Sequence, residues 1–310
     1  MNFTLRQLQV FLEIVKWESV TKAAEELNMT QPAVSIQLRN FQAQFDVPLT
    51  EIIGKKLYVT EFGRSVAVIA ENVFQDAEAL QFQTKAYSGL LTGRLKISSA
   101  STGKYVIPYF LSDFLKRHSG IDLVLDVTNK QKVVESLTQN TIDFALVSVL
   151  PEGIDVCEEL LLENKLFLVG NKPEFDPVAP LIFRENGSAT RQSMDRHFGG
   201  ALERKSLELT SNEAVKQAVI AGLGYSILPL IGIKNELAVR SLFIVPSPGL
   251  PIITTWRLVW LRDKKLSPAA SAYLDFLREE KERIIGANFQ WYLDYPHPDQ
   301  GRPETTAADC

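Results

Sequence analysis

The sequence predicts a multidomain protein in which an all-α N-terminal domain and a long linker helix precede a larger two-lobed α/β domain. The chain has 310 residues, more than the ~100–150 of a typical single domain. Apolar residues recur at helical spacing through the N-terminal part, whereas from Arg94 onward strands alternate with helices. Hydrophobic residues make up 45% and charged residues 23% of the chain, which is enough apolar material for folded cores.

Composition also restricts the class of protein. No stretch approaches the ~20 apolar residues of a membrane span, and the N-terminus lacks the layout of a signal peptide, so we expect a cytoplasmic protein with no membrane partner. Two cysteines, Cys157 and Cys310, and three scattered histidines, His118, His197 and His297, form neither a disulfide framework nor a zinc site. We therefore predict no metal, no cofactor and two inert thiols.

The first three helices are predicted from apolar spacing and capping residues. Leu8, Phe11, Leu12 and Val15 give the opening helix one buried face. Thr21 is the predicted N-cap of a short second helix, residues 22–27, in which paired alanines permit close helix packing. Thr30 is the predicted N-cap of a third helix, with Pro32 in its first turn. The buried stripe of this third helix is predicted to be Val34, Leu38, Phe41 and Phe45.

The opposite face of the third helix carries uncharged polar, apolar and basic side chains: Gln31, Pro32, Ser35, Ile36 and Arg39. Two short helices joined by a tight turn match the helix-turn-helix that fits the DNA major groove. Gln pairs with adenine and Arg with guanine, Ser contacts phosphate or base edges, and Pro or Ile contacts a thymine methyl. Residues 52–60 then predict a hairpin wing whose Lys55 and Lys56 reach phosphate.

Net charge argues against this interpretation, because the chain carries −4 and nucleic-acid-binding proteins are usually basic. The local charge differs, since no acidic residue lies between Glu26 and Asp46. The competing interpretation is a three-helix packing module with no nucleic-acid role.

Residues 5–63 closely resemble the DNA-binding domain of LysR-type transcriptional regulators, most specifically in the segment AAEELNMTQPAVSIQL. The resemblance implies that Gln31, Pro32, Ser35 and Ile36 meet the major groove of promoter DNA and that Lys55 and Lys56 meet phosphate. Two departures predict a lower affinity than is typical. Ile36 stands where many relatives have Arg, and Thr50-Glu51-Ile52 replaces Phe-Glu-Arg. The predicted DNA-binding residues are Thr30, Gln31, Pro32, Ser35, Ile36, Arg39, Lys55 and Lys56.

A linker helix is predicted from residue 61 to about residue 87. Its apolar side chains follow the heptad spacing of a coiled-coil seam, interrupted at Asp76 and Gln83. The seam residues are Phe62, Val66, Ile69, Val73 and Leu80. A helix packed on its own domain is the alternative, but helix-turn-helix proteins usually read paired half-sites as symmetric dimers, so we favour dimerisation. Ser88-Gly89 and Thr92-Gly93 mark a hinge.

The α/β domain is predicted from strands alternating with helices around parallel sheets. Strands are expected at residues 95–99, 123–128, 142–147, 166–169, 207–210 and 257–261. Helices are expected from about Tyr105 and at 133–137, 191–198 and 213–221. Four polar junctions lie at the ends of strands or the starts of helices, where ligands bind in such sheets. They are Ser101-Thr102, Thr128-Asn129-Lys130, residues 187–191 and Thr210-Ser211-Asn212. The alternative for each is an ordinary helix cap.

The rest of the chain, to about Ile285, resembles the periplasmic-binding-protein-like effector domain of the same family. STGKYVIPYFLSDF, NGSATR, SNEAVKQAVIAGLGYSILP and LSPAASAYLDFL are similar to the branch that regulates RuBisCO operons. The resemblance implies two lobes joined by crossover strands near 163–170 and 261–267, with a small anionic metabolite held between them. The implied effector-binding residues are Ser101, Thr102, Lys104, Thr128, Asn129, Lys130, Ser188 and Arg191. Lys216 fits the same idea, although exposed lysines are usually solvated surface.

These expectations define four segments of the chain. Residues 1–60 form the winged helix-turn-helix and 61–91 the linker helix and hinge. Residues 92–285 form the effector domain, with lobe I at about 92–163 and 267–285 and lobe II at about 164–266. Residues 286–310 form a loose tail. The expected partners are double-stranded promoter DNA, an anionic effector, a second copy in a homodimer or homotetramer, and RNA polymerase.

Three other classes of protein compete with this interpretation. An enzyme needs a nucleophile with a base, paired carboxylates or a metal set, and none occurs at suitable spacing. Gly222-Leu223-Gly224 follows a helix, so Gly222 is interpreted as a helix cap and not as part of a dinucleotide loop. A periplasmic solute-binding protein is excluded by the helix-turn-helix and by the absence of a signal peptide. A DNA-binding protein without a ligand stays open.

Overall fold

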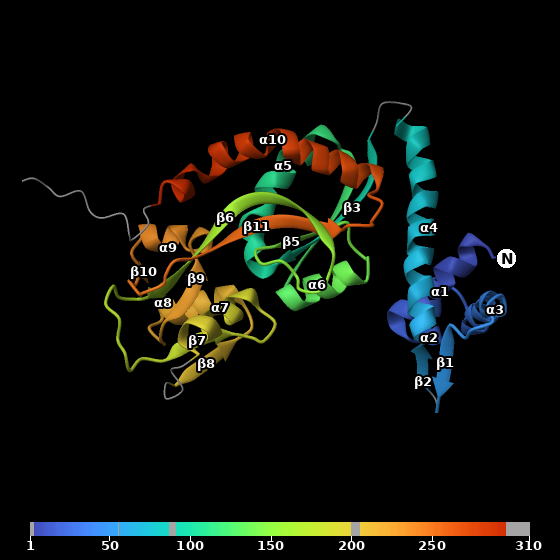
Figure 1. Ribbon diagram of the computed structural model, residues 1–310, viewed down its shortest axis with the longest axis horizontal. Helices are drawn as coiled ribbons and strands as arrows, with labels where there is room; N and C mark the ends of the chain where they lie inside the picture. Colours follow the sequence, from blue (N-terminus) through green and yellow to red (C-terminus); the bar gives the residue numbers. More distant parts are fainter. Residues whose placement is uncertain (1–2, 55, 87–90, 200–204, 296–310) are drawn as a thin grey trace, which may run out of the picture. The chain divides into compact units, whose positions relative to one another are not determined.

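The computed structural model describes residues 3–54, 56–86, 91–199 and 205–295, and the chain divides into two compact units. The first unit comprises residues 1–93 with 265–269, and the second comprises residues 94–264 with 270–310. Figure 1 shows short helices, a hairpin and one long helix in the first unit, and mixed helices and strands in the second.

The N-terminal unit is a winged helix-turn-helix followed by a long helix. Its elements are α1 Leu5–Trp17, α2 Val20–Glu26, α3 Gln31–Gln42, β1 Thr50–Ile53, β2 Lys56–Val59 and α4 Glu61–Ala86. Helix α1 lies at the centre, because Val10 and Ile14 pack on α2, α3 and β2, while Leu8 and Phe11 pack on α3 and α4. Ala23 and Ala24 are buried, which confirms that the paired alanines let α2 pack closely.

Helix caps account for most boundaries in this unit, and one predicted cap was wrong. Helix α2 begins after Ser19, not Thr21, because the Ser19 hydroxyl accepts the Lys22 N–H. Thr30 occupies the N-cap position of α3 but its side chain makes no capping hydrogen bond. Phe45 lies beyond the end of α3 and still packs edge-on against Phe41, at 5.1 Å between ring centroids.

The second unit contains both lobes of the α/β domain. Its first part comprises β3 Thr92–Ala100, the 3-10 helix η1 Ser101–Tyr105, α5 Ile107–Arg117, β4 Gly120–Thr128, α6 Lys130–Thr138, β5 Phe144–Val147 and β6 Val156–Gly170. Its second part comprises β7 Leu181–Arg184, α7 Ala189–Phe198, β8 Ser206–Leu209, α8 Asn212–Ile220, β9 Ser226–Pro229, η2 Leu230–Gly232, α9 Lys234–Ala238, β10 Phe243–Ile244, β11 Ile252–Leu261 and α10 Pro268–Leu293.

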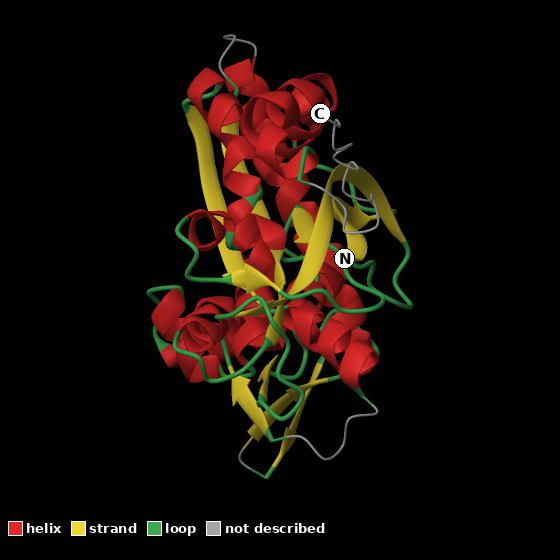
Figure 2. Ribbon diagram, turned by 90° about the vertical axis from the view of Figure 1, so that its left-hand side faces the viewer, coloured by secondary structure: helices red, strands yellow, loops and turns green. Residues whose placement is uncertain are grey.

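Two long antiparallel strands, β6 and β11, join the two lobes. They pair along the whole of β11, from Leu261 opposite Val156 to Ile252 opposite Leu166. In lobe I, β5 pairs with β11 and with β3, and β4 completes that edge of the sheet. In lobe II, β9 and β10 pair with β6, and β7 pairs with β8. Figure 2 shows helices packed against these strands.

The structure corrects three expectations for this unit. The second crossover is β11, Ile252–Leu261, and not residues 261–267, because strand pairing with β6 ends at Leu261. The sheets are mixed, since β3–β5 and β7–β8 are parallel but every pairing of β6 and β11 is antiparallel. The chain does not loosen at residue 286, because α10 continues to Leu293.

Gly222 confirms its interpretation as a helix-ending residue. It follows α8 with φ +78°, in the left-handed region that favours glycine. Its N–H donates to Val219 O, and the Leu223 N–H donates to Ala218 O, which is the Schellman pattern. The segment is therefore a helix terminus.

Candidate functional site

Helix α3 divides into a buried and an exposed face. Val34 and Phe41 are buried in the domain core. The predicted contact residues lie on the other face, where Thr30, Gln31, Pro32, Ile36 and Arg39 are exposed and Ser35 is half-buried. Ile36 is 52% exposed, although water is a poor environment for its side chain. This face offers amide, hydroxyl, methyl and guanidinium groups to a partner outside the domain, and these are the groups that read base edges.

The hairpin beside α3 forms the wing. Gly54 at its tip has φ +67°. Lys56 is exposed and its Nζ lies 5.1 Å from the centroid of the Tyr58 ring, whereas Lys55 lies outside the described residues. The Gln42 side-chain oxygen accepts the Thr50 N–H at 3.1 Å and the Thr50 hydroxyl at 2.9 Å, which fixes the wing to the end of α3.

Helix α4 has one face toward its own domain and another exposed. Ala67 and Ala70 are buried against the domain core, and Val66 packs there too. The alternative of a helix packed on its own domain therefore holds for this face. Ile69 is 63%, Val73 38% and Phe62 36% exposed. The side chain of Leu80 lies outside the described residues.

The first contact between the lobes of the second unit forms around Ser101. Ser101 follows β3 in lobe I, whereas Arg184 ends β7 and Asn212 begins α8 in lobe II. Asn212 Nδ2 donates to the Ser101 Oγ at 3.2 Å, and Arg184 Nη1 donates to the same oxygen at 3.4 Å. One lobe I hydroxyl thus accepts from two lobe II side chains.

Arg184 is the buried cation of this cluster. Its side chain is 2% exposed and forms a bidentate pair with Glu185, at 2.7 Å between Nε and Oε2 and 2.8 Å between Nη2 and Oε1. Burial of a guanidinium is tolerable because this carboxylate neutralises it. The 3.4 Å contact of Nη1 with Ser101 is long for a hydrogen bond, so an anionic ligand oxygen would be a stronger acceptor.

Asn212 adds an acceptor to the cluster. Its side chain is 4% exposed, and within the described part of the chain its buried Oδ1 has no hydrogen-bond partner. An unpaired buried amide oxygen is costly unless a ligand or water donates to it. The cluster thus combines donors suited to an anion with one acceptor suited to a hydroxyl.

A second interlobe contact joins the start of α6 to the loop before α7. The Gln131 N–H donates to Gly187 O at 3.2 Å. Asn129 is the N-cap of α6, since its Oδ1 accepts the Lys132 N–H at 3.0 Å. Ser188 is buried at the N-cap of α7 and makes no side-chain capping bond there. Ser101 and Asn212, from two of the predicted junctions, therefore meet across the lobe interface, and Gln131, which follows a third junction, meets Gly187 of the fourth.

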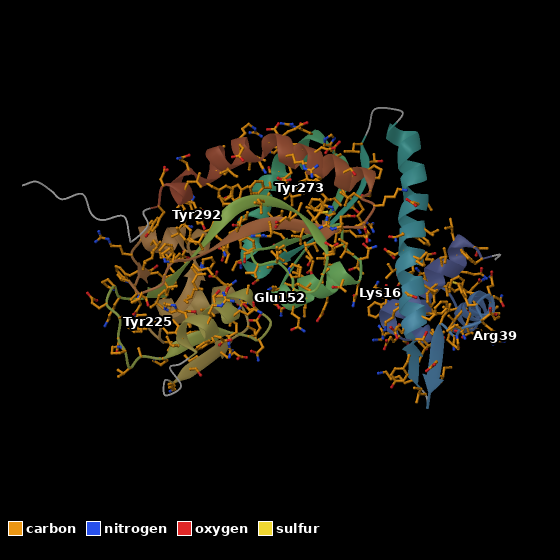
Figure 3. All side chains as sticks on the ribbon, viewed as in Figure 1. Lys16, Arg39, Glu152, Tyr225, Tyr273 and Tyr292 are labelled. Carbon is orange, nitrogen blue, oxygen red and sulfur yellow. The ribbon has the colours of Figure 1, made fainter. Side chains whose placement is uncertain are left out.

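Lys130 stands at this second contact. Burial lowers the pKa of its ammonium group, Glu152, which is labelled in Figure 3, opposes that effect, and Arg196 of α7 adds to it. Lys130 in lobe I and Arg196 in lobe II are thus close enough to repel one another. An anion between them would relieve this repulsion.

The other predicted effector residues do not take part in the two interlobe contacts described above. Thr102 is buried, Lys104 is exposed with its Nζ over the Tyr105 ring, and Thr128 is half-buried at the end of β4. Arg191 already has partners. Although burial opposes it, hydrogen bonds to Asp195 and Glu208 raise the pKa of Arg191.

Sequence reasoning missed Arg184 and Glu185 and did not select Asn212, although Asn212 lies in a predicted junction. The available signal for Arg184 was a charged residue that ends the apolar run Leu181-Ile182-Phe183. A charged residue at the end of an apolar run is equally typical of a strand that ends at the protein surface. The burial of Arg184 is therefore shown only by the fold.

Within residues 3–54, 56–86, 91–199 and 205–295, no helix combines the length and apolarity of a membrane span. Across the same residues, no three His, Cys, Asp or Glu side chains gather as a metal site would require.

A winged helix-turn-helix, a long helix and a two-lobed α/β domain with polar interlobe contacts define the class of DNA-binding transcription regulators that carry an effector-binding domain. The chain belongs to the LysR family. "LysR substrate binding domain" matches residues 88–282, and "Bacterial regulatory helix-turn-helix protein, lysR family" matches residues 5–64.

The relatives agree with this family. The chain is 38% identical over 299 residues to the RuBisCO operon transcriptional regulator of Allochromatium vinosum, covering 92% of this chain and 98% of the relative. The resemblance to the RuBisCO-operon branch is thereby confirmed, and such relatives are named as transcriptional regulators.

Solved structures give the same fold. The regulatory domain of CcmR from Synechocystis PCC6803, in complex with 2-PG, is 31% identical, covers 62% of this chain and 98% of that chain, and has a TM-score of 0.57. Full-length OxyR from Pseudomonas aeruginosa is 18% identical, covers 92% of this chain and 95% of that chain, and has a TM-score of 0.67. The predicted fold class is thus confirmed.

Proposed function

We propose that this LysR-family regulator binds promoter DNA through the exposed face of α3 and the wing, and that a small phosphorylated or carboxylated metabolite bound between its lobes modulates this binding. The observation that carries the effector proposal is the buried Arg184, which donates to the same Ser101 hydroxyl as Asn212 where the lobes join. A buried cation with a weakly engaged Nη1 favours an anionic ligand.

The proposed effector is 2-phosphoglycolate or a metabolite of the same chemistry. The CcmR regulatory domain, 31% identical to this chain, binds 2-PG. Arg184 and the helix start at Asn212 would receive one anionic group, and Asn129, Lys130 and Ser188 would receive the other. Thr102, Thr128, Lys104 and Arg191 are proposed as a surrounding shell.

We assign the DNA contacts to Thr30, Gln31, Pro32, Ser35, Ile36, Arg39, Lys55 and Lys56. The first six share the exposed side of α3, which supports a role in the major groove. Dimerisation is assigned to α4 through Phe62, Ile69 and Val73, because a helix of a folded domain rarely leaves such an exposed stripe uncovered, and through Leu80 by its heptad spacing. The protein would act in the cytoplasm, as a dimer or tetramer, on RNA polymerase at the promoter, and without catalysing a reaction.

Calorimetric titration with 2-phosphoglycolate tests the effector assignment. Ser101→Ala removes the hydroxyl shared by Arg184 and Asn212, so we expect the dissociation constant to rise about tenfold. Thr138→Ala, on the exposed surface of α6, serves as the control and should bind as the wild type does. Equal affinity of the wild type and Ser101→Ala would overturn the assignment.

A further inference from the structure

Helix α10 extends beyond the part of the chain that the family match covers. The match ends at residue 282, whereas α10 continues to Leu293. Figure 1 shows α10 running along the second unit from lobe I toward α9 and β10 of lobe II. We call residues 286–295 the C-terminal strap.

The earlier part of α10 is anchored in lobe I. Arg283 pairs with Asp113 at 2.7 Å, and Glu280 pairs with Arg117 at 2.7 Å, both on α5. Tyr273 packs edge-on against Phe114 at 5.2 Å between centroids. These contacts fix the base from which the strap extends.

The strap begins with one more lobe I contact. Phe289 is almost fully buried and stacks on Phe110 of α5, with ring centroids 6.0 Å apart and an interplanar angle of 16°. Its ring also meets the edge of Tyr109 at 5.1 Å. Aromatic pairs of this kind are worth about 0.5–1.5 kcal/mol beyond their buried area.

Two residues further on, the strap reaches lobe II. The Lys234 Nζ, at the start of α9, lies 4.7 Å from the centroid of the Trp291 ring. Tyr295 meets Phe167 at 6.0 Å, and Phe167 pairs with Leu228 of β9 in the lobe II part of the sheet. A single segment therefore contacts both lobes.

Between these contacts the strap is hydrogen-bonded to the crossover strand β6. The Lys165 N–H in β6 donates to the Tyr292 hydroxyl at 2.7 Å, and the Lys165 Nζ donates to Tyr292 O at 3.2 Å. Lys165 is only 3% exposed, so its ammonium group depends on the Tyr292 carbonyl oxygen near the C-terminal end of α10. Figure 3 labels Tyr273 in the anchored part of α10 and Tyr292 in the strap.

We propose that the C-terminal strap is an interlobe brace that restricts rotation about β6 and β11 and so sets how readily the lobes close on the effector. Closure of two lobes bends the few residues that connect them, which here lie in β6 and β11. A helix anchored in lobe I that also holds Lys165 and Lys234 limits this bending. The brace thereby also affects effector affinity, because the apparent affinity is proportional to the fraction of molecules in the closed form. The affinity part rests on the proposed function, whereas the bracing part does not.

The test uses the full chain without ligand. Trp291→Ala combined with Tyr292→Phe removes the Lys234 contact and the hydroxyl bound by the Lys165 N–H. Gln290→Ala is the matched control, since Gln290 is exposed on the same turn and binds only Asp294 among the described contacts. Spin labels at Thr138→Cys in lobe I and Val239→Cys in lobe II report the interlobe distance after Cys157→Ser and Cys310→Ser.

We expect the double variant to broaden the interlobe distance distribution and Gln290→Ala to leave it unchanged. Identical distributions for the wild type and the double variant would overturn the brace. Titration with 2-phosphoglycolate is the second arm, in which the double variant should bind about fivefold more weakly. A broadened distribution with unchanged affinity would overturn the link to the effector. A broadened distribution with no binding even by the wild type would support the brace and reject the effector.

Discussion

The two proposed binding surfaces of this protein differ in how their polar groups are engaged before any ligand arrives. On α3, Gln31 and Arg39 are exposed, and the contact from Gln31 to the Ser35 hydroxyl, at 3.5 Å, is long. Between the lobes, Arg184 is buried and held by Glu185, and Asn212 is bound to Ser101. The DNA surface can therefore bind without rearrangement, whereas the effector site must exchange internal partners for ligand atoms.

The difference in burial determines how strongly single substitutions should affect binding at each surface. An exposed surface contributes mainly through phosphate contacts and base hydrogen bonds, so each residue acts almost independently and salt weakens binding. A buried site couples its residues, because removal of one partner leaves another unpaired in a poorly solvated place. Substitutions between the lobes should therefore have larger effects than substitutions on α3.

The largest expected effect is at Arg184. Arg184→Met with Glu185→Gln removes the buried ion pair without leaving a lone charge, and it should weaken 2-phosphoglycolate binding about 10- to 100-fold. The measurement is calorimetric titration, with a thermal melt to verify folding. Arg191→Met is the comparison variant and should weaken binding less, because Arg191 lies in the proposed surrounding shell and is already engaged by Asp195 and Glu208. A greater loss for Arg191→Met would reverse the assignment of the two arginines.

The next largest effect is expected on assembly. Ile69→Asp places a charge on the exposed face of α4, so the dissociation constant of the dimer should rise at least about tenfold. Sedimentation velocity over a concentration series measures it. Arg64→Gln, which affects only the pair with Glu18 of the same unit, should leave the dimer intact. A dimer indifferent to Ile69→Asp would move the interface elsewhere.

A smaller effect should follow from one charge on α3. Arg39→Gln should weaken promoter binding severalfold and reduce the slope of log K against log salt by about one. Lys16→Gln is the matched control, since Lys16 lies on α1 and pairs with Glu13 (Figure 3). Fluorescence anisotropy at several salt concentrations distinguishes them. Equal slopes for the two variants would remove Arg39 from the interface.

The smallest effect concerns His197 in α7, whose Nε2 lies 3.2 Å from the Ser247 hydroxyl. Burial lowers the pKa of His197 below its ordinary 6.5, so between that lowered pKa and 6.5 the unfolded chain binds more protons than the folded chain. The free energy of unfolding should therefore fall as the pH drops through this window. The contribution should be below about 0.5 kcal/mol, because the ring is only half-buried and solvent screens the effect. Urea unfolding of the wild type and His197→Gln at pH 7.5 and 5.5 measures it, and an equal pH dependence would contradict it.

The same contrast explains what the sequence could predict. The face of α3 follows from helical periodicity alone, because Val34 and Phe41 fix which side is buried. The limits of α4 and the presence of the wing can likewise be predicted from the local sequence. Arg184, the crossover strand β11 and the strap of α10 depend on partners far away in the chain, such as Leu166 opposite Ile252. Local pattern does not encode those pairings.

We infer that effector binding between the lobes changes the affinity of the protein for its promoter. Anisotropy titration of a fluorescent promoter fragment, with and without saturating 2-phosphoglycolate, measures this coupling. We expect the ligand to change the promoter dissociation constant of the wild type at least about fivefold and to leave that of the Arg184→Met/Glu185→Gln variant unchanged. An identical response of both proteins would contradict it.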